Sequence, residues 1–256
     1  MTIQSLLLAA ILFFNLFDLA SVSWAQSAAS GLFAEANELY RRGEYEEARN
    51  KYLQITADGV RDPRLFYNLG NASFKESRLG DAIVWYERAV QLDPRDDDIR
   101  ANLRFAHQVK KDREPSIEQN ALLRALEFAY LFPTVNELSV SCALFLCAVW
   151  IVASLRWLRS RSNSWQAWTL LSCASLSILT SILLASRIYD LEEKKFAIVT
   201  VQEAMARSGP GSGQTPVFVL HEGTKIEIDR AEGSWYLIRL PNGSAGWMSD
   251  VSITII

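Results

Sequence analysis

Hydrophobic and polar positions follow different patterns in successive parts of the chain. Apolar residues dominate three blocks, near residues 6–17, 138–155 and 165–186. Between the first two blocks, small, aromatic and charged residues recur in a regular helical repeat. From residue 196 onward the pattern changes to short β-rich runs that are broken by turns. The pattern therefore predicts a helical region, two long apolar helices and an all-β region, in that order.

The helical region repeats itself at a shift of 34 residues. That shift places Asn37 over Asn71 and Tyr52 over Tyr86. A period of 34 is typical of tetratricopeptide repeats, in which each unit is a pair of antiparallel helices. Pro94 ends the second helix of the second unit, because proline cannot continue a helix. Small residues let the two helices of that unit approach closely, and they are Gly70, Ala82 and Ala89.

A third unit is incomplete. The counterpart of Ala82 would be Ser116, which lies beside Pro115, so we expect a single capping helix near residues 96–110. Two helix pairs and one cap are close to the practical minimum for a solenoid, because each repeat buries a face on its neighbour. We assign residues 26–112 to this α-helical tetratricopeptide solenoid.

Four asparagines recur at the same period on the first helix of each unit. In the tetratricopeptide proteins that this region resembles, that helix lines the concave groove. Amides offer hydrogen-bond donors and acceptors, so they can pair with the backbone of an extended peptide. The alternative is that they are solvated residues on a helix face. The candidates for a partner-binding groove are Asn37, Asn68, Asn71 and Asn102.

Residues 1–25 have the features of a secretory signal peptide. An apolar core is followed by Ser23 and Ala25, small residues at the two positions that a signal peptidase reads. We expect cleavage after Ala25, with an uncleaved anchor as the alternative. The parts expected to be exported carry no thiol, since the chain has only three cysteines, all in the later apolar blocks, at Cys142, Cys147 and Cys173.

The two later apolar blocks predict a transmembrane hairpin. Residues 138–155 and 165–188 are long enough to cross a hydrocarbon core of about 30 Å at about 1.5 Å per residue. The loop between them, residues 156–164, carries three arginines and no acidic residue, so we expect it to be cytoplasmic. Both flanking regions would then lie on the periplasmic or outer side of a bacterial cytoplasmic (inner) membrane.

Small residues recur at every fourth position in both predicted spans, a spacing that favours close packing of helices. They pack against each other within the hairpin or, as the alternative, dock onto another membrane protein. These residues are Ser139, Ala143 and Cys147 in the first span and Cys173, Ser177, Ser181 and Ala185 in the second.

A linker, residues 113–137, precedes the first span. Apolar residues between Leu122 and Leu131 are followed by Pro133. This segment is either an amphipathic helix at the membrane interface or a simple helical linker.

Residues 195–256 are similar to bacterial SH3 domains, which are small all-β barrels. The resemblance rests on the order of MARSGPG, FVLHEGTKIEI and GSWYLIRLPNGSAGW. Turn residues at 221–223 and 241–243 predict hairpin turns. The two tryptophans of this region, Trp235 and Trp247, are then either core residues or aromatic residues of a surface groove.

Charge and composition argue against several classes of function. The chain has 26 basic and 29 acidic residues, which gives no overall field for nucleic acid. Its two histidines, His107 and His221, have no metal ligands at suitable spacing, and no exported nucleophile, base and orienting group can be assembled. We therefore expect no enzyme activity, no cofactor and no metal.

The order of these parts resembles the BatE-like proteins of the Bat aerotolerance operon family. YNLGN and YERA lie within the repeat, DDDIRANL follows it, and two spans and an SH3 domain complete the order. The resemblance implies a membrane-anchored scaffold in a cell-envelope complex linked to stress tolerance. Its implied partners are von Willebrand A-type membrane proteins and a MoxR-type ATPase. The alternative is a peptidoglycan-binding adaptor that recruits or regulates a cell-wall enzyme.

Overall fold

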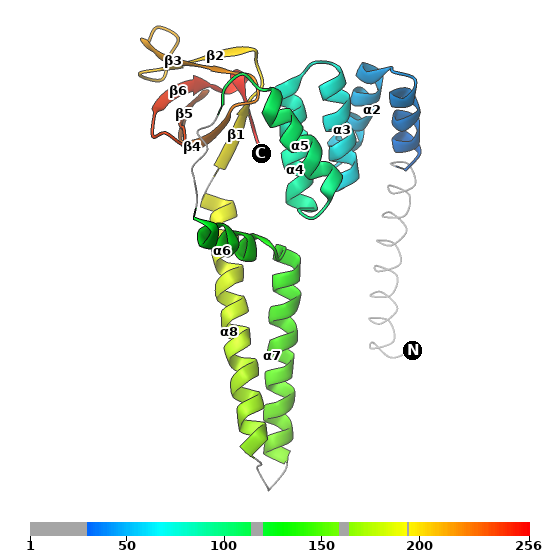
Figure 1. Ribbon diagram of the computed structural model, residues 1–256, viewed down its shortest axis with the longest axis vertical. Coiled ribbons are helices and arrows are strands. Elements are labelled where there is room, and N and C mark those ends of the chain that lie inside the picture. Colours follow the sequence, from blue (N-terminus) through cyan, green and yellow to red (C-terminus); the bar gives the residue numbers. More distant parts are fainter. Residues whose placement is uncertain (1–29, 114–119, 159–163, 194) are drawn as a thin grey trace, which may run out of the picture.

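The computed structural model describes residues 30–113, 120–158, 164–193 and 195–256. A repeat module of short helices, a long two-helix hairpin and a C-terminal β-sheet domain follow one another in the predicted order (Figure 1). The repeat module and the sheet domain lie side by side at one end of the hairpin, and we call these two parts together the head. The predicted signal peptide and most of the predicted cytoplasmic loop lie outside the described residues.

The described part of the repeat module contains the helices that the 34-residue period predicts. They span residues 30–41, Tyr45–Ala57 (α2), Pro63–Lys75 (α3), Leu79–Leu92 (α4) and Asp97–Val109 (α5). The start of α3 is fixed locally, because Asp62 accepts the N–H of Arg64 at 2.8 Å and Pro63 is the first helical residue. Asp96 caps α5 in the same way. Helix α4 ends two residues before Pro94.

Small residues set the distance between the helices of the module. Ala48, Ala82 and Ala89 are fully buried. A Cβ atom on Gly70 would lie 2.5 Å from ring atoms of Tyr86, well inside van der Waals contact. The absence of a side chain at position 70 therefore allows α3 and α4 to pack at this distance.

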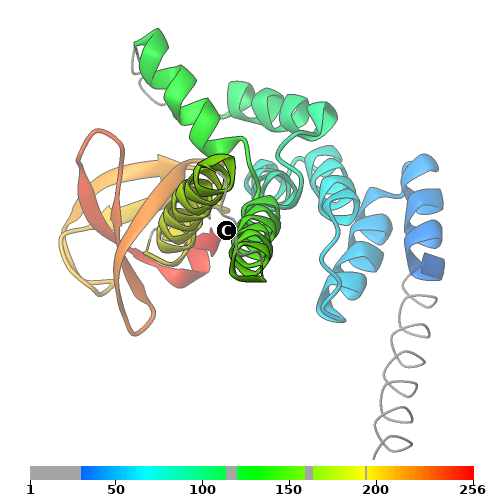
Figure 2. The ribbon, with the colours of Figure 1, turned by 90° about the horizontal axis from the view of Figure 1, so that it is seen from below.

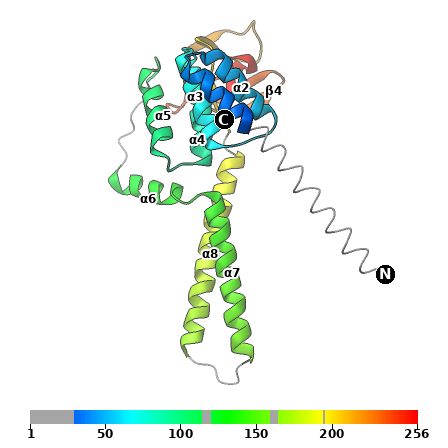
Figure 3. The same cartoon turned by 90° about the vertical axis from the view of Figure 1, so that its right-hand side faces the viewer.

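The hairpin consists of α7 (Val135–Leu158) and α8 (Ser164–Glu193), which pack along each other. Each contains a stretch long and apolar enough to cross a membrane, with 22 residues in Val135–Arg156 and 27 in Ser164–Asp190. At about 1.5 Å per residue, either stretch exceeds a hydrocarbon core of about 30 Å. Helix α6 (Ala121–Leu131) lies across the head end of the hairpin (Figure 3).

The contact between α7 and α8 differs in part from the predicted one. On α8, Ser177 is buried, as predicted for a contact face of small residues. On α7, the buried residue is Leu138, and the Sγ atom of Cys142 lies 3.2 Å from the Oγ atom of Ser181. One residue along an α-helix is a rotation of about 100°, so a stripe that starts at Ser139, directly after the buried Leu138, lies off the contact face. The predicted α7 residues are therefore exposed, and they are Ser139, Ala143 and Cys147.

The C-terminal domain is an antiparallel sheet that curls around its own core, as the view from below shows (Figure 2). Its seven strands are hydrogen-bonded in the order β3-β2-β6-β5-β4-β1-β7. Ile226, Ile238 and Met248 are fully buried in the core. The strands span Lys195–Val199 (β1), Glu203–Arg207 (β2), Pro216–His221 (β3), Lys225–Glu232 (β4), Trp235–Arg239 (β5), Ala245–Ser249 (β6) and Ile253–Ile255 (β7).

One of the two predicted hairpin turns joins strands that are not paired. Residues 241–243 connect the neighbouring strands β5 and β6, with Gly243 at a φ of +84°, as the sequence predicts. Residues 221–223 form a turn with Gly223 at a φ of +86°, but its strands β3 and β4 are separated by three others. The prediction of a hairpin here is wrong, because turn chemistry specifies local backbone angles and leaves strand pairing open.

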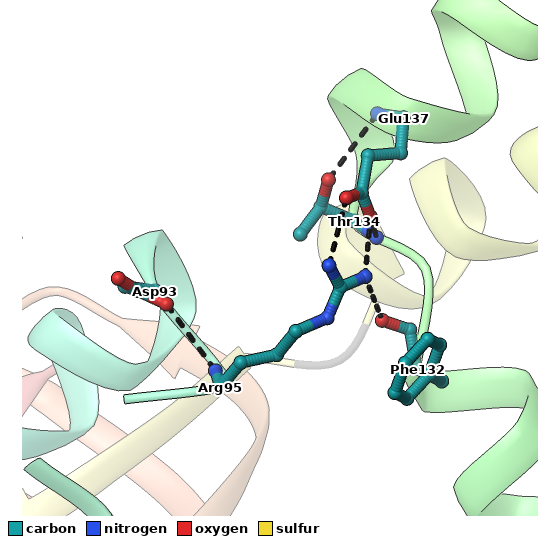
Figure 4. A network of polar contacts seen from close by, with 5 residues as sticks. All are labelled: Asp93, Arg95, Phe132, Thr134 and Glu137. Carbon is teal, nitrogen blue, oxygen red and sulfur yellow. Dashed lines mark hydrogen bonds and ion pairs between the residues drawn. The ribbon is translucent and has the colours of Figure 1, made fainter. Parts of the chain in front are cut away.

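An arginine joins the head to the hairpin (Figure 4). The guanidinium of Arg95 donates to both carboxylate oxygens of Glu137, at 2.9 and 2.6 Å, and to the carbonyl oxygen of Phe132 at 2.9 Å. Thr134 and Glu137 form a capping box at the start of α7, in which each side chain accepts the backbone N–H of the other. The segment after α4 is thereby held at the start of α7.

Candidate interaction surfaces

The first two predicted asparagines connect the first two repeat units. The Oδ1 atom of Asn37 accepts the hydroxyl of Tyr52 at 2.7 Å and the Nδ2 of Asn68 at 2.9 Å. Asn68 lies on α3, whereas Asn37 lies on the helix over residues 30–41. These hydrogen bonds therefore hold the first helices of neighbouring units together.

The same arrangement recurs one period later. The Oδ1 atom of Asn71 accepts the hydroxyl of Tyr86 at 2.7 Å and the Nδ2 of Asn102 at 2.8 Å. Asn102 lies on the capping helix α5 and also donates to the hydroxyl of Tyr67 at 3.2 Å. We call the four asparagines and their two tyrosines, Tyr52 and Tyr86, the asparagine ladder.

Burial keeps the hydroxyl groups of the ladder protonated. It raises the pKa of Tyr52 to about 12, and it raises the pKa of Tyr86 as well. Both hydroxyls therefore stay hydrogen-bond donors into the alkaline range, and the asparagine oxygens remain their acceptors.

A hollow of about 300 Å³ opens beside the second half of the ladder, and we call it the groove hollow. Within the described residues, the Nδ2 atom of Asn71 and the Oδ1 atom of Asn102 have no hydrogen-bond partner, so they are available to a ligand. Phe105 is 53% exposed, and its ring stacks at a tilt on that of Phe74 with centroids 5.6 Å apart. The hollow can receive an apolar side chain beside two amide groups. Its other lining residues are Tyr40, Tyr67, Lys75 and Tyr86.

The two tryptophans of the sheet domain lie outside its core. Ile238 of β5 and Met248 of β6 are core residues, so strand alternation turns Trp235, Leu237 and Trp247 to the opposite face. Leu237 and Trp247 are directly opposite each other on neighbouring strands. Exposed apolar residues continue this surface onto β2 and β3, at Met205, Val217 and Val219.

The repeat module and the sheet domain share a buried apolar cluster. Ile198 of β1 is fully buried in one cluster with Ala82 and Ile83 of α4. A Cβ atom on Gly80 would lie 2.5 Å from the backbone oxygen of Val199, so glycine permits this approach. The sequence carries one signal of the junction. Residues 196–199 form an uninterrupted apolar run, as in a strand covered on both faces, and the structure buries the last three of them.

The turn between β3 and β4 makes the polar contacts of the same junction. Glu222 accepts the N–H of Gly80 at 2.8 Å, in the first turn of α4. Asp112, which follows α5, accepts the backbone N–H of His221 at 2.7 Å and the hydroxyl of Thr224 at 2.8 Å. Its second oxygen lies 2.7 Å from Nδ1 of His221. This turn therefore binds the repeat module at two places.

Carboxylates at the junction have lowered pKa values. Burial by itself raises the pKa of Glu87, but the hydrogen bonds and positive charges of His107 and Lys225 outweigh it and hold the pKa below its usual value. Burial also raises the pKa of Asp112, and the hydrogen bonds from His221 and Thr224 more than reverse that effect. Both carboxylates are ionised at neutral pH and join the two parts of the head.

Comparison with known protein families identifies the two parts of the head. A tetratricopeptide repeat family matches residues 33–97, and a bacterial SH3 domain family matches residues 206–254. Domains of both kinds are typically interaction modules without catalytic activity. No curated protein matches the chain. The predicted tetratricopeptide repeats and the predicted bacterial SH3 domain are thereby confirmed.

Proposed function

We propose that this chain is a non-enzymatic scaffold that is anchored in the bacterial cytoplasmic membrane and holds protein partners on its outer side. The observation that carries the proposal is the apolar cluster shared by the repeats and the SH3 domain. These domains flank the hairpin in the sequence, so they can pack together only if both ends of the hairpin lie on one side of the membrane. The arginine-rich loop then lies on the cytoplasmic side, as the positive-inside rule favours.

The surface of the hairpin supports insertion into lipid. Trp150, Leu144 and Trp168 are each more than 60% exposed. So large an exposed apolar surface is unfavourable in water and suits a hydrocarbon environment.

Protease accessibility tests this topology. Protease added to spheroplasts should remove both the repeat module and the SH3 domain, while the hairpin stays in the membrane fraction. If either module is protected until the membrane is broken, the proposed topology is wrong.

The groove hollow and the free amide atoms beside it are the proposed partner site. An extended peptide could place an apolar side chain against Phe105 while its backbone pairs with Asn71 and Asn102. The rest of the ladder, Asn37 and Asn68, continues the same face of the module.

A crosslinking pull-down from native membranes tests the groove. Phe105→Ala should lower the capture of partners several-fold, because it removes an exposed aromatic contact and no buried hydrogen bond. Val109→Ala on the same helix is the matched control, since Val109 is also exposed but does not line the groove hollow. Unchanged capture by Phe105→Ala would exclude the groove hollow as the partner site.

The resemblance to the Bat aerotolerance family suggests which partners to look for. They are von Willebrand A-type membrane proteins and a MoxR-type ATPase system. Mass spectrometry of the crosslinked complexes should find them among the captured proteins, and their absence from complexes that contain other envelope proteins would contradict this assignment.

A peptidoglycan-binding adaptor is the second candidate, and the outer face of the SH3 sheet favours it. Trp247 and Leu237 form an apolar surface there on which a sugar ring could stack. Full-length protein in detergent should then sediment with purified sacculi, and Trp247→Ala should lower the bound fraction. Equal sedimentation of both proteins would remove this candidate.

A further inference from the structure

A second hollow, of about 520 Å³, lies away from the groove hollow, and we call it the arginine hollow. Its wall is formed by the end of α2, the loop before α3, the first turn of α3, α4 from Trp85 onward, and Ile256, which follows β7. Phe66 and Trp85 line it, with ring centroids 5.5 Å apart. Two arginines, Arg61 and Arg88, also line it. The hollow thus combines an aromatic wall with two positive charges.

These two charges have no acidic partner among the described residues. Arg88 lies over the ring of Trp85, 4.7 Å from its centroid, and donates to the carbonyl oxygen of Ile255 at 2.8 Å. These contacts fix the guanidinium but do not neutralise it. Burial, and then the positive charge of Arg61, lower the pKa of Arg88. An oxyanion between the two arginines would be attracted by both of them.

The arginine hollow lies at the end of the head that faces the hairpin. Helix α4 ends at Leu92, and Arg95 contacts the start of α7 directly after it. Arg88 lies about one helical turn before the end of α4, which corresponds to ~6 Å along the helix axis. If the hairpin spans a membrane, the hollow is therefore close to the level of the lipid phosphate groups.

We propose that the arginine hollow binds a phosphate group between Arg61 and Arg88 and holds the apolar part of the ligand against Trp85 and Phe66. A guanidinium suits this task because it can donate two parallel hydrogen bonds to phosphate oxygens. The phosphate belongs either to the headgroup of an anionic phospholipid or to a soluble organic phosphate. The lipid source rests on the proposed membrane anchoring, and the soluble source does not.

Native mass spectrometry of the full-length protein in a nonionic detergent tests the site with phosphatidylglycerol and phosphatidylcholine at equal concentrations. The wild type should retain phosphatidylglycerol in preference. Arg61→Gln should weaken retention about tenfold, the size of effect expected for loss of a hydrogen bond to a charged group. Arg64→Gln is the matched control, because it removes the same charge only three residues further along the chain. The Arg64 side chain is exposed and is paired with Asp62.

Glycerol phosphate, added to the lipid complex, distinguishes the two sources. Displacement of the lipid identifies a soluble organic phosphate as a ligand, and persistence of the lipid identifies the headgroup. Equal retention of the two lipids by the wild type, without binding of glycerol phosphate, would overturn the proposal. The proposal would also be overturned if Arg61→Gln and Arg64→Gln weakened the retention of phosphatidylglycerol equally while the circular dichroism of both variants was unchanged.

Carbonate extraction of membranes separates this proposal from the proposed function. A protein that resists extraction but binds no phosphate contradicts the arginine hollow alone. A protein that is extracted contradicts the membrane anchor, and binding of glycerol phosphate would still support the hollow.

Discussion

Single asparagines in the repeat module have two tasks at once. The Oδ1 atom of Asn71 holds Tyr86 and Asn102 in place, while its Nδ2 atom is available beside the groove hollow. Replacing Asn71 by alanine would leave the buried hydroxyl of Tyr86 without its acceptor, at a cost of about 1–3 kcal/mol. Loss of binding in that variant would mix a folding effect with a contact effect, so the exposed ring of Phe105 gives a cleaner test.

The tyrosines of the ladder predict how stability depends on alkaline pH. Because burial raises the pKa of Tyr52 to about 12, the folded chain keeps this proton at pH values where the unfolded chain loses it. The stabilising contribution is complete below about pH 10, the usual pKa of tyrosine, and is lost as the pH rises through about 12. Tyrosinate absorbance and helical circular dichroism should therefore change together in this range.

Tyr52→Phe provides the control for that experiment. This substitution should lower the stability of the repeat module at neutral pH. Between pH 10 and 12 the variant should then lose less further stability than the wild type. An equally steep alkaline loss in this variant would mean that other groups cause it.

At the scale of helices and strands, α4 makes two kinds of contact, the first with its neighbours α3 and α5 in the repeat module and the second with β1 of the sheet domain. Gly80→Ala tests the second contact, because the added Cβ atom would lie 2.5 Å from a backbone oxygen that cannot move aside easily. The gain in helix propensity is at most about 1 kcal/mol, whereas such a clash costs about 1–3 kcal/mol. Hydrogen exchange should therefore become faster in β1 and in the first turns of α4.

Gly213→Ala is the matched control for the junction. A Cβ atom at position 213 would meet no heavy atom within 4 Å, so exchange at the junction should not change. Unchanged exchange in Gly80→Ala as well would mean that the junction can open or shift at little cost.

The sequence predicts the positions of these helices and strands better than it predicts the contacts between them. The 34-residue period and the proline after α4 predict where the helices of the repeat module lie, and the structure has helices there. Strand pairing around residues 221–223 and the face that α7 presents to α8 depend on partners distant in sequence. The asparagine recurrence was visible in the sequence, but its bonds to Tyr52 and Tyr86 could be assigned only after the helices were placed.

At the scale of the whole molecule, acidic side chains join the two halves of the head. The pKa values of Asp112 and Glu87 are lowered in the folded state, so their contribution is present above the usual carboxylate pKa of about 4. It is lost as the pH falls through the lowered values. We expect the SH3 domain to separate from the repeats below about pH 4, before the repeats unfold.

This separation can be measured in a variant whose native cysteines are replaced and whose exposed residues Asn50 and Ser212 carry dyes. Energy transfer between the two dyes then reports the distance between the repeats and the SH3 domain. Transfer should be constant from pH 8 to about pH 5 and should fall reversibly below about pH 4. In the Asp112→Asn, Glu87→Gln variant the transition should be smaller. If energy transfer falls by the same amount in that variant, groups other than Asp112 and Glu87 cause the separation.

The shared cluster around Ile198 also has a consequence for biosynthesis. A ribosome completes the repeat module and the hairpin before it reaches β1, so Ile83 of α4 has no covering strand until the last part of the chain has been made. An apolar face left bare on a nascent protein is a binding site for chaperones and proteases. Chains that stop after the hairpin would keep this apolar face of α4 exposed. The surface that packs on β1 in the complete protein would then mark such chains as unfinished.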